Sequence, residues 1–382
     1  MPIFPPQKNG RFFPRRFFLL VAAAWWLAWP LRAQQVVAPL PEPPMPIRGM
    51  TISNPAGGDQ EWTSAALAQT FDELKVLGVN TVALDTFAQV REDGHIDFSD
   101  PREPERISRP LDGARERGLA VMLIARLGFS GTRFSWRGEI SFNTNEEWNR
   151  FFADYLRWIV ATARLAQAHG AGLLCIGLEY THAQVIEERW REIITAVRAV
   201  YGGKLTYGGS WDSYGQVGFY DALDYLGVLA YFPLTSKPDP SLKQIAQGWE
   251  KHLRNLRALS QKLHDKPVLF VQIGYNESAR AASDPWSAPR GGPHAAEIQS
   301  RCVDAALHVM QREAARGGWL AGLFWWQWPL TNAPPATMAA PGGEDFDLRQ
   351  PHLQKLVANF WRRPADAPAP AEIPASDAAA SP

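Results

Sequence analysis

The feature that most constrains the fold is a regular alternation of short apolar runs with longer amphipathic segments. Each run is nearly continuous in apolar residues, as expected for strands that are covered on both faces. On this basis we predict strands at 47–53, 81–87, 120–127, 172–180, 205–211, 225–232, 267–275 and 319–328.

Segments with helical periodicity separate these runs. The clearest lie at 63–77, 146–169, 183–200, 239–263 and 294–316, and weaker ones lie at 103–117 and 216–222. Repeated strand-then-helix units predict an α/β fold of the (β/α)8 TIM barrel type, in a single domain. An open doubly wound sheet is the alternative, but SNPAGGDQ after the first run lacks the glycine spacing of a dinucleotide-binding loop.

The two ends of the chain differ in composition from its centre. Residues 1–33 combine a basic start with an apolar stretch, which predicts an export signal peptide, and the Arg15-Arg16 pair resembles the twin-arginine type. We therefore expect a periplasmic or secreted protein with no membrane contact beyond the export signal. An uncleaved signal anchor is the alternative. The rest should comprise a Pro-rich linker at 34–45, the barrel at 46–362 and a disordered Pro/Ala-rich tail at 363–382.

The composition excludes several classes of function. The chain has 39 basic and 39 acidic residues without a block of like charge, which argues against a nucleic acid partner. Of the histidines, only His182 lies near a predicted strand end, so we expect no metal and no cofactor. Two cysteines cannot form a disulfide framework, and we expect both to be buried free thiols, with a single bridge between them as the alternative. The 16 Trp favour a sugar-binding protein, because indole rings stack on pyranose faces.

The active site of a TIM barrel lies at the C-terminal ends of its strands, which makes Glu179 the first candidate. Glu179 follows the apolar run LLCIGL at the end of the fourth predicted strand, so its carboxyl group should be poorly solvated and its pKa raised. A raised pKa suits a general acid that works near neutral pH. A structural ion pair with Arg126 or Arg137 is the alternative role.

Other polar and aromatic side chains also follow the predicted strands. We expect them to line a site where a monomer binds a neutral polysaccharide or oligosaccharide. The predicted substrate-binding residues are Arg126, Trp136, Arg137, Trp211, Asp212, Tyr231, Tyr275, Trp286, Trp326 and Trp328.

Residues 45–332 resemble glycoside hydrolase family 113, a family of retaining β-mannanases in the large clan of (β/α)8 glycosidases. The matching stretches include CIGLEYT (175–181), ALDYLGVLAYFPL (222–234), KPVLFVQIGY (266–275) and GLFWWQW (322–328). The resemblance implies that Glu179 is the acid/base. It also implies a nucleophile at the end of the seventh strand, where the family has Glu and this chain has Gln272.

Gln272 argues against the standard retaining mechanism. A neutral amide is a poor nucleophile and brings no negative charge to the oxocarbenium-like transition state. An inverting mechanism would need another carboxylate, for which Asp212, Glu139 and Glu277 are candidates. We therefore expect a glycoside hydrolase-like barrel that acts on or binds β-mannan or a related polysaccharide. The alternatives are a non-catalytic carbohydrate-binding protein of the cell envelope and a structural or assembly role there.

Overall fold

The structure is a computed structural model that describes residues 37–53, 64–286, 289–330 and 346–362. The expected signal peptide and the expected C-terminal tail lie outside the described residues. Within the described ranges, no helix is long and apolar enough to cross a membrane.

Eight parallel strands close into a barrel, which confirms the predicted (β/α)8 fold. Strand β1 pairs with β2 on one side and with β9 on the other, so the ring has no open edge. A ninth, two-residue strand, β3 (Ile96–Asp97), pairs antiparallel with the end of β2. The barrel strands are β1 (Ile47–Ser53), β2 (Thr81–Val90), β4 (Ala120–Gly128), β5 (Leu173–Leu178), β6 (Lys204–Gly209), β7 (Leu226–Leu229), β8 (Val268–Ile273) and β9 (Leu320–Pro329).

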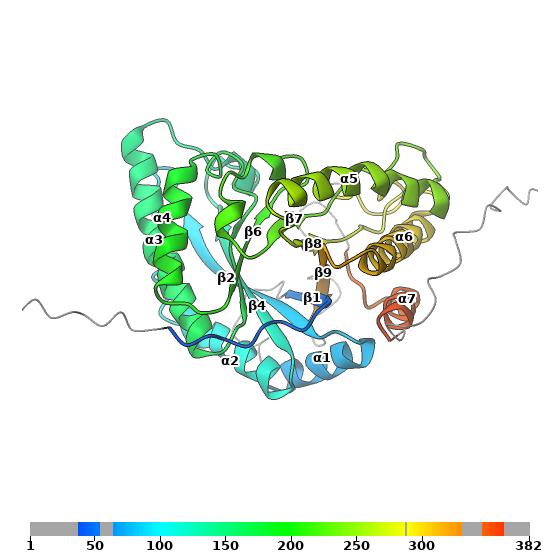
Figure 1. Ribbon diagram of the computed structural model, residues 1–382, viewed down its shortest axis with the longest axis horizontal. Helices are drawn as coiled ribbons and strands as arrows, with labels where there is room; N and C mark the ends of the chain where they lie inside the picture. Colours follow the sequence, from blue (N-terminus) through cyan, green and yellow to red (C-terminus); the bar gives the residue numbers. More distant parts are fainter. Residues whose placement is uncertain (1–36, 54–63, 287–288, 331–345, 363–382) are drawn as a thin grey trace, which may run out of the picture. The chain divides into compact units, whose positions relative to one another are not determined.

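Helices surround the ring of strands (Figure 1). Two of the longer ones, α3 and α5, begin at capping boxes built on Thr144 and Ser241. The weakly predicted helix at 216–222 is wrong, because short 3-10 turns at Tyr214–Gln216 and Tyr220–Ala222 take its place. The α-helices are α1 (Ser64–Leu77), α2 (Glu103–Glu116), α3 (Asn145–Ala168), α4 (Glu187–Arg198), α5 (Leu242–Lys262), α6 (Ala295–Ala315) and α7 (Pro351–Trp361).

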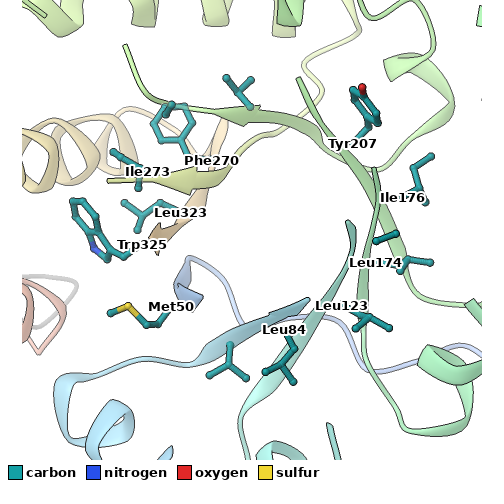
Figure 2. Close-up of a cluster of buried hydrophobic side chains, with 14 of the residues drawn as sticks. Met50, Leu84, Leu123, Leu174, Ile176, Tyr207, Phe270, Ile273, Leu323 and Trp325 are labelled. Atoms are coloured by element: carbon teal, nitrogen blue, oxygen red, sulfur yellow. The ribbon is translucent and has the colours of Figure 1, made fainter. Parts of the chain in front are cut away.

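Alternation along the strands divides the buried side chains into two clusters. The larger cluster fills the layer between strands and helices, and Figure 2 shows members of it on β1, β2, β4, β5, β6, β8 and β9. The smaller cluster, which includes Met122, Leu269 and Phe324, fills the barrel interior. Both cysteines are buried and free, as expected. Residues that face the barrel interior near the C-terminal strand ends therefore form the barrel mouth.

Three strands carry a β-bulge near these C-terminal ends. Each has one residue more than its neighbour between two paired positions: β5 between Cys175 and Leu178, β8 between Phe270 and Ile273, and β9 between Trp325 and Trp328. A bulge reverses which following side chains face inward, and bulges are common beside active sites. All three therefore change which side chains reach the barrel mouth.

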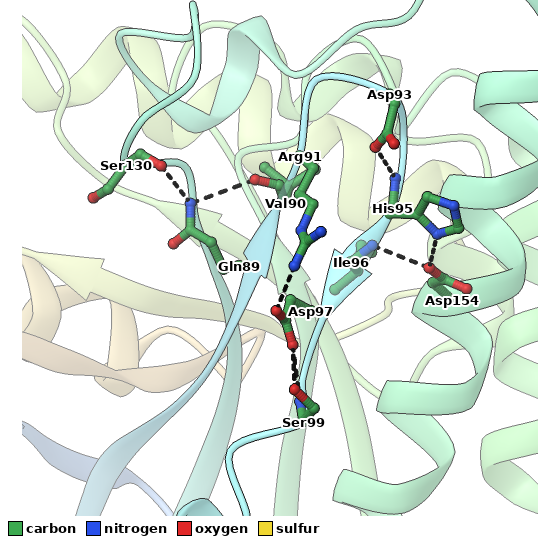
Figure 3. Close-up of polar contacts among 10 residues, drawn as sticks. All are labelled: Gln89, Val90, Arg91, Asp93, His95, Ile96, Asp97, Ser99, Ser130 and Asp154. Carbon is green, nitrogen blue, oxygen red and sulfur yellow. Dashed lines mark hydrogen bonds and ion pairs between the residues drawn. The ribbon is translucent and has the colours of Figure 1, made fainter.

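Polar contacts hold the end of β2 and the short strand β3 against neighbouring elements (Figure 3). On α3, one carboxylate oxygen of Asp154 accepts a hydrogen bond from the backbone N–H of Ile96 at 3.1 Å and lies 3.0 Å from His95 Nδ1. Gln89 Nε2 donates to the backbone oxygen of Ser130 at 3.1 Å. The Asp154 contacts hold β3 against α3. The Gln89 bond holds the loop after β4 beside β2, and that loop carries Trp136 and Arg137.

Candidate active site

Glu179 follows β5 directly, with a left-handed backbone conformation (φ 60°). This conformation is uncommon for a residue other than glycine and occurs often at functional sites. Its backbone N–H donates to the oxygen of Gly208 at 2.8 Å. The next residue, Tyr180, donates its own N–H to Tyr207 Oη at 3.0 Å. The backbone on both sides of the Glu179 side chain is thereby fixed.

The Glu179 carboxyl group lies in a mostly buried, charged environment. Its side chain is 19% exposed, and Oε2 lies 3.4 Å from Arg137 Nη1. Burial raises the pKa of Glu179, and the positive charges of Arg137 and Arg126 oppose that rise without cancelling it. Burial also lowers the pKa of Arg137. Both directions show that loss of hydration outweighs the attraction within this long ion pair.

Replacing Glu179 with the isosteric Gln should stabilise the protein at neutral pH. The folded-state pKa lies above that of the unfolded chain, so ionisation of Glu179 costs stability as the pH rises through the folded-state pKa. We expect Glu179→Gln to raise the free energy of unfolding at pH 7. The gain should vanish below about pH 4, where the carboxyl group is protonated in both states. Urea unfolding at the two pH values checks this, and an equal gain at both would contradict it.

A buried ion pair joins β2 and β4 at the mouth. Arg126 Nη2 lies 3.0 Å from Asp85 Oδ1, and the two side chains are only 6% and 8% exposed. Neither atom makes a directional hydrogen bond to the described residues, so the contact is mainly ionic. The Arg126 guanidinium also stacks on the Trp326 ring, 5.1 Å from its centroid. The Arg126 side chain on β4 thus contacts both β2 and β9, and its positive charge opposes the rise in the pKa of Glu179.

Gln272 lies at the bulge of β8 and faces the barrel interior. Val271 belongs to the interior cluster, whereas Ile273 and Tyr275 belong to the outer one, so the alternation shifts by one residue here. The Gln272 side chain is buried, and its Nε2 has no hydrogen-bond partner among the described residues. The neutral amide of Gln272 therefore occupies an inward position at the end of the seventh barrel strand. Glu179 directly follows the fourth.

Most of the predicted aromatic residues remain at or near the surface around the mouth. Trp211 and Trp286 stack with ring centroids 4.7 Å apart and an interplanar angle of 24°. Trp286 is 38% exposed and Trp136 is 39% exposed, which leaves ring surface free for a ligand. Tyr231 is buried in the interior cluster and packs edge-on against Phe346.

Two predicted residues are not brought to the mouth. Tyr275 and Trp328 lie in the outer cluster, between strands and helices, with 2% of each side chain exposed. The bulges in β8 and β9 cause this, because each turns the side chains beyond it to the other face.

Sequence reasoning left two kinds of residue out of the predicted set. Asp85 is one, although its place near the end of the predicted strand 81–87 and its charge opposite to that of Arg126 were visible signals. The others are buried tyrosines that fix the strand ends. Tyr155 donates its hydroxyl to the oxygen of Ile176 at 2.6 Å, and Tyr180 accepts from the N–H of Leu127 at 3.1 Å. Nothing in their local sequence distinguishes these from ordinary core tyrosines.

The three alternative carboxylates differ in their contacts. Glu139 accepts from the N–H and hydroxyl of Ser135. Glu277 accepts from Gln350 Nε2 at 2.8 Å. Asp212 is exposed, and its negative charge adds to the rise in the pKa of Glu179. Asp212 is therefore an exposed carboxylate that acts electrostatically on Glu179. No group of three or more His, Cys, Asp or Glu that could hold a metal occurs in the described part of the chain.

Comparisons with known proteins agree with the resemblance seen in the sequence. The model of Glycoside Hydrolase Family 113 matches residues 53–349. The GH113 β-mannanase AaManA from Alicyclobacillus acidocaldarius, solved in complex with ManMIm, is 25% identical, with a TM-score of 0.69 over 82% of this chain and 96% of that one. A GH113 β-1,4-mannanase is 20% identical, with a TM-score of 0.69 over 82% and 98%. A GH5_18 protein from Streptomyces cattleya, in complex with GlcNAc, is 15% identical, with a TM-score of 0.53 over 87% and 83%. No curated protein matches the chain.

Proposed function

Because the chain belongs to glycoside hydrolase family 113, we propose that it acts on β-mannan or a related polysaccharide, with Glu179 as general acid. The observation that carries this proposal is the burial of the Glu179 carboxyl group, which raises its pKa. A carboxyl group whose pKa is raised holds its proton more readily and can donate it to the leaving glycosidic oxygen. The choice of mannan rests on the similar solved structures, which are β-mannanases.

The retaining route is not open to this chain in its usual form. Retention needs a carboxylate about 5–5.5 Å from the acid to attack the anomeric carbon, and Gln272 is a neutral amide. Water must then be the nucleophile, and Asp212 is our candidate for the base that activates it. Attack by water in a single step would invert the configuration of the anomeric carbon.

A second candidate function is non-catalytic binding of the same polysaccharide. Gln272 favours it, because an amide can still hydrogen-bond a sugar hydroxyl while it removes the nucleophile. The stacked Trp211 and Trp286, together with the exposed Trp136, offer flat apolar surface that suits sugar rings in either case.

One experiment separates these two functions. We expect the wild-type protein to cleave mannan slowly and to release the anomer opposite to the linkage in the substrate, as followed by NMR. Glu179→Gln should lower kcat/KM by about 100-fold or more, the range of general acid catalysis. Absence of turnover together with measurable binding of mannotetraose would instead establish the binding protein. Absence of both would reject the saccharide function.

We also infer that the protein is exported to the periplasm or secreted, and that it acts as a monomer. The basic start and apolar stretch of residues 1–33 support export. Fractionation of the producing cells tests the location, and full-length protein retained in the cytoplasm would contradict it. Sedimentation of the purified protein tests its oligomeric state.

A further inference from the structure

A buried hydrogen-bond network connects the loop after β5 with the loop after β6. Its centre is Gln184, whose side chain is fully buried. Gln184 Oε1 accepts from Tyr207 Oη at 3.3 Å, and Gln184 Nε2 donates to the backbone oxygen of Ser213 at 3.1 Å. The Ser213 carbonyl can only accept, so it fixes which end of the amide faces it.

One end of this network reaches the backbone beside Glu179. Tyr207 Oη accepts from the N–H of Tyr180, the residue after Glu179, at 3.0 Å. The N–H of Gln184 donates to the oxygen of the same Tyr180 at 2.7 Å. Gln184 and Tyr207 therefore hold Tyr180 from both its amide and its carbonyl side.

The other end reaches the loop that carries Trp211 and Asp212. Ser213 follows Asp212 directly, and its N–H donates to the oxygen of Ser210 at 3.0 Å, which closes the turn containing both residues. Ser213 is buried, whereas Asp212 beside it is exposed. The bond from Gln184 to Ser213 thus fastens the turn that carries the exposed Asp212 to the buried framework beside Glu179.

We infer that Gln184 is a positioning residue, which sets Trp211 and Asp212 relative to Glu179 and so shapes the saccharide site. It does so through Tyr207 and Ser213 and touches no substrate itself. Groups that hold a site in place through such buried hydrogen bonds matter because small displacements of binding residues weaken binding and catalysis. The inference rests on the proposed saccharide function, which gives Trp211 and Asp212 their roles.

The stacked Trp211–Trp286 pair provides a readout that is independent of any ligand. Two indoles at 4.7 Å couple electronically and should give an exciton signal in circular dichroism. The test variant is Gln184→Met, which keeps the side-chain volume but removes both hydrogen bonds. We expect the exciton signal to fall by at least about half and the Kd for mannotetraose to rise about tenfold, the usual effect of losing a supporting contact.

Gln299→Met is the matched control. Gln299 is also fully buried, and its Nε2 donates to the oxygen of Tyr275 at 2.8 Å, a residue that packs in the outer cluster. This control should lose stability like Gln184→Met but keep the exciton signal and the affinity. If Gln184→Met fails to fold, Tyr207→Phe removes the bridging hydroxyl and keeps the ring, with a smaller change expected in the same direction.

The two readouts separate this inference from the proposed function. Should Gln184→Met, or Tyr207→Phe in its place, keep both the exciton signal and the affinity of the control, the positioning role is overturned while saccharide binding stands. If the wild-type protein binds no mannotetraose, the proposed function fails, and the exciton signal alone decides whether Gln184 holds the loop.

Discussion

Gln272→Glu is expected to raise kcat/KM on β-mannan by at least about 1000-fold, because it restores the carboxylate that a retaining glycosidase requires. Glu has nearly the same shape as Gln, so the substitution should fit the inward position at the β8 bulge. Initial rates on soluble mannan measure the effect.

The stereochemistry of the first product checks the mechanism behind this gain. The Gln272→Glu variant should release the anomer that retains the configuration of the substrate, whereas any residual wild-type cleavage should invert it. Adding Glu179→Gln to this variant should abolish the gain, since the acid/base is then missing. The matched control is Gln261→Glu, the same change on an exposed position near the end of α5. A gain that is equal in both variants, or absent in Gln272→Glu, would show that position 272 does not face the substrate.

The barrel itself was predictable because its strands are buried on both faces. Burial of both faces leaves a nearly continuous apolar run in the sequence, and all eight predicted strands occur. The errors fall where tertiary contacts decide the structure. The segment 216–222 makes only short turns around the buried Tyr220. Helix α7, which follows the eighth barrel strand, was not predicted.

The candidate site was predictable from the sequence at positions where a charged residue follows an apolar strand. Glu179 stands out because a carboxylate interrupts an apolar run, and its raised pKa follows from that burial. The sequence did not predict that the side chains of Tyr275 and Trp328 point toward the helices, because the bulges in β8 and β9 have no recognisable sequence pattern. Without them, simple alternation would put Trp326 and Trp328 on one face of β9, whereas the structure puts Trp328 in the outer cluster.

The bulge in β8 also decides which side chain of this strand reaches the barrel mouth. Without the bulge, Val271 and Ile273 would share the inward face and Gln272 would point toward the helices. The observed shift brings Gln272 inward and turns Tyr275 outward in one step. The backbone therefore presents position 272 to the mouth, although the Gln272 side chain cannot attack the anomeric carbon as a carboxylate would.

Arg126→Met should produce the largest loss of stability among single changes at the mouth. It leaves the Asp85 carboxylate buried without its counter-charge, a change that typically costs about 3–5 kcal/mol. It also removes the stacking of the guanidinium on Trp326. Urea unfolding at pH 7 should show a large fall in the midpoint with an unchanged slope.

The double variant Asp85→Leu with Arg126→Met decides whether the buried charge is the cause. Removal of both charges should recover most of the loss, because replacing a buried ion pair with apolar side chains is often neutral or stabilising. Losses that simply add in the double variant would mean that the two side chains contribute through packing alone. If the recovery is observed, the pair contributes little net stability, which fits a role for its charges at the barrel mouth better than a role in holding the barrel together.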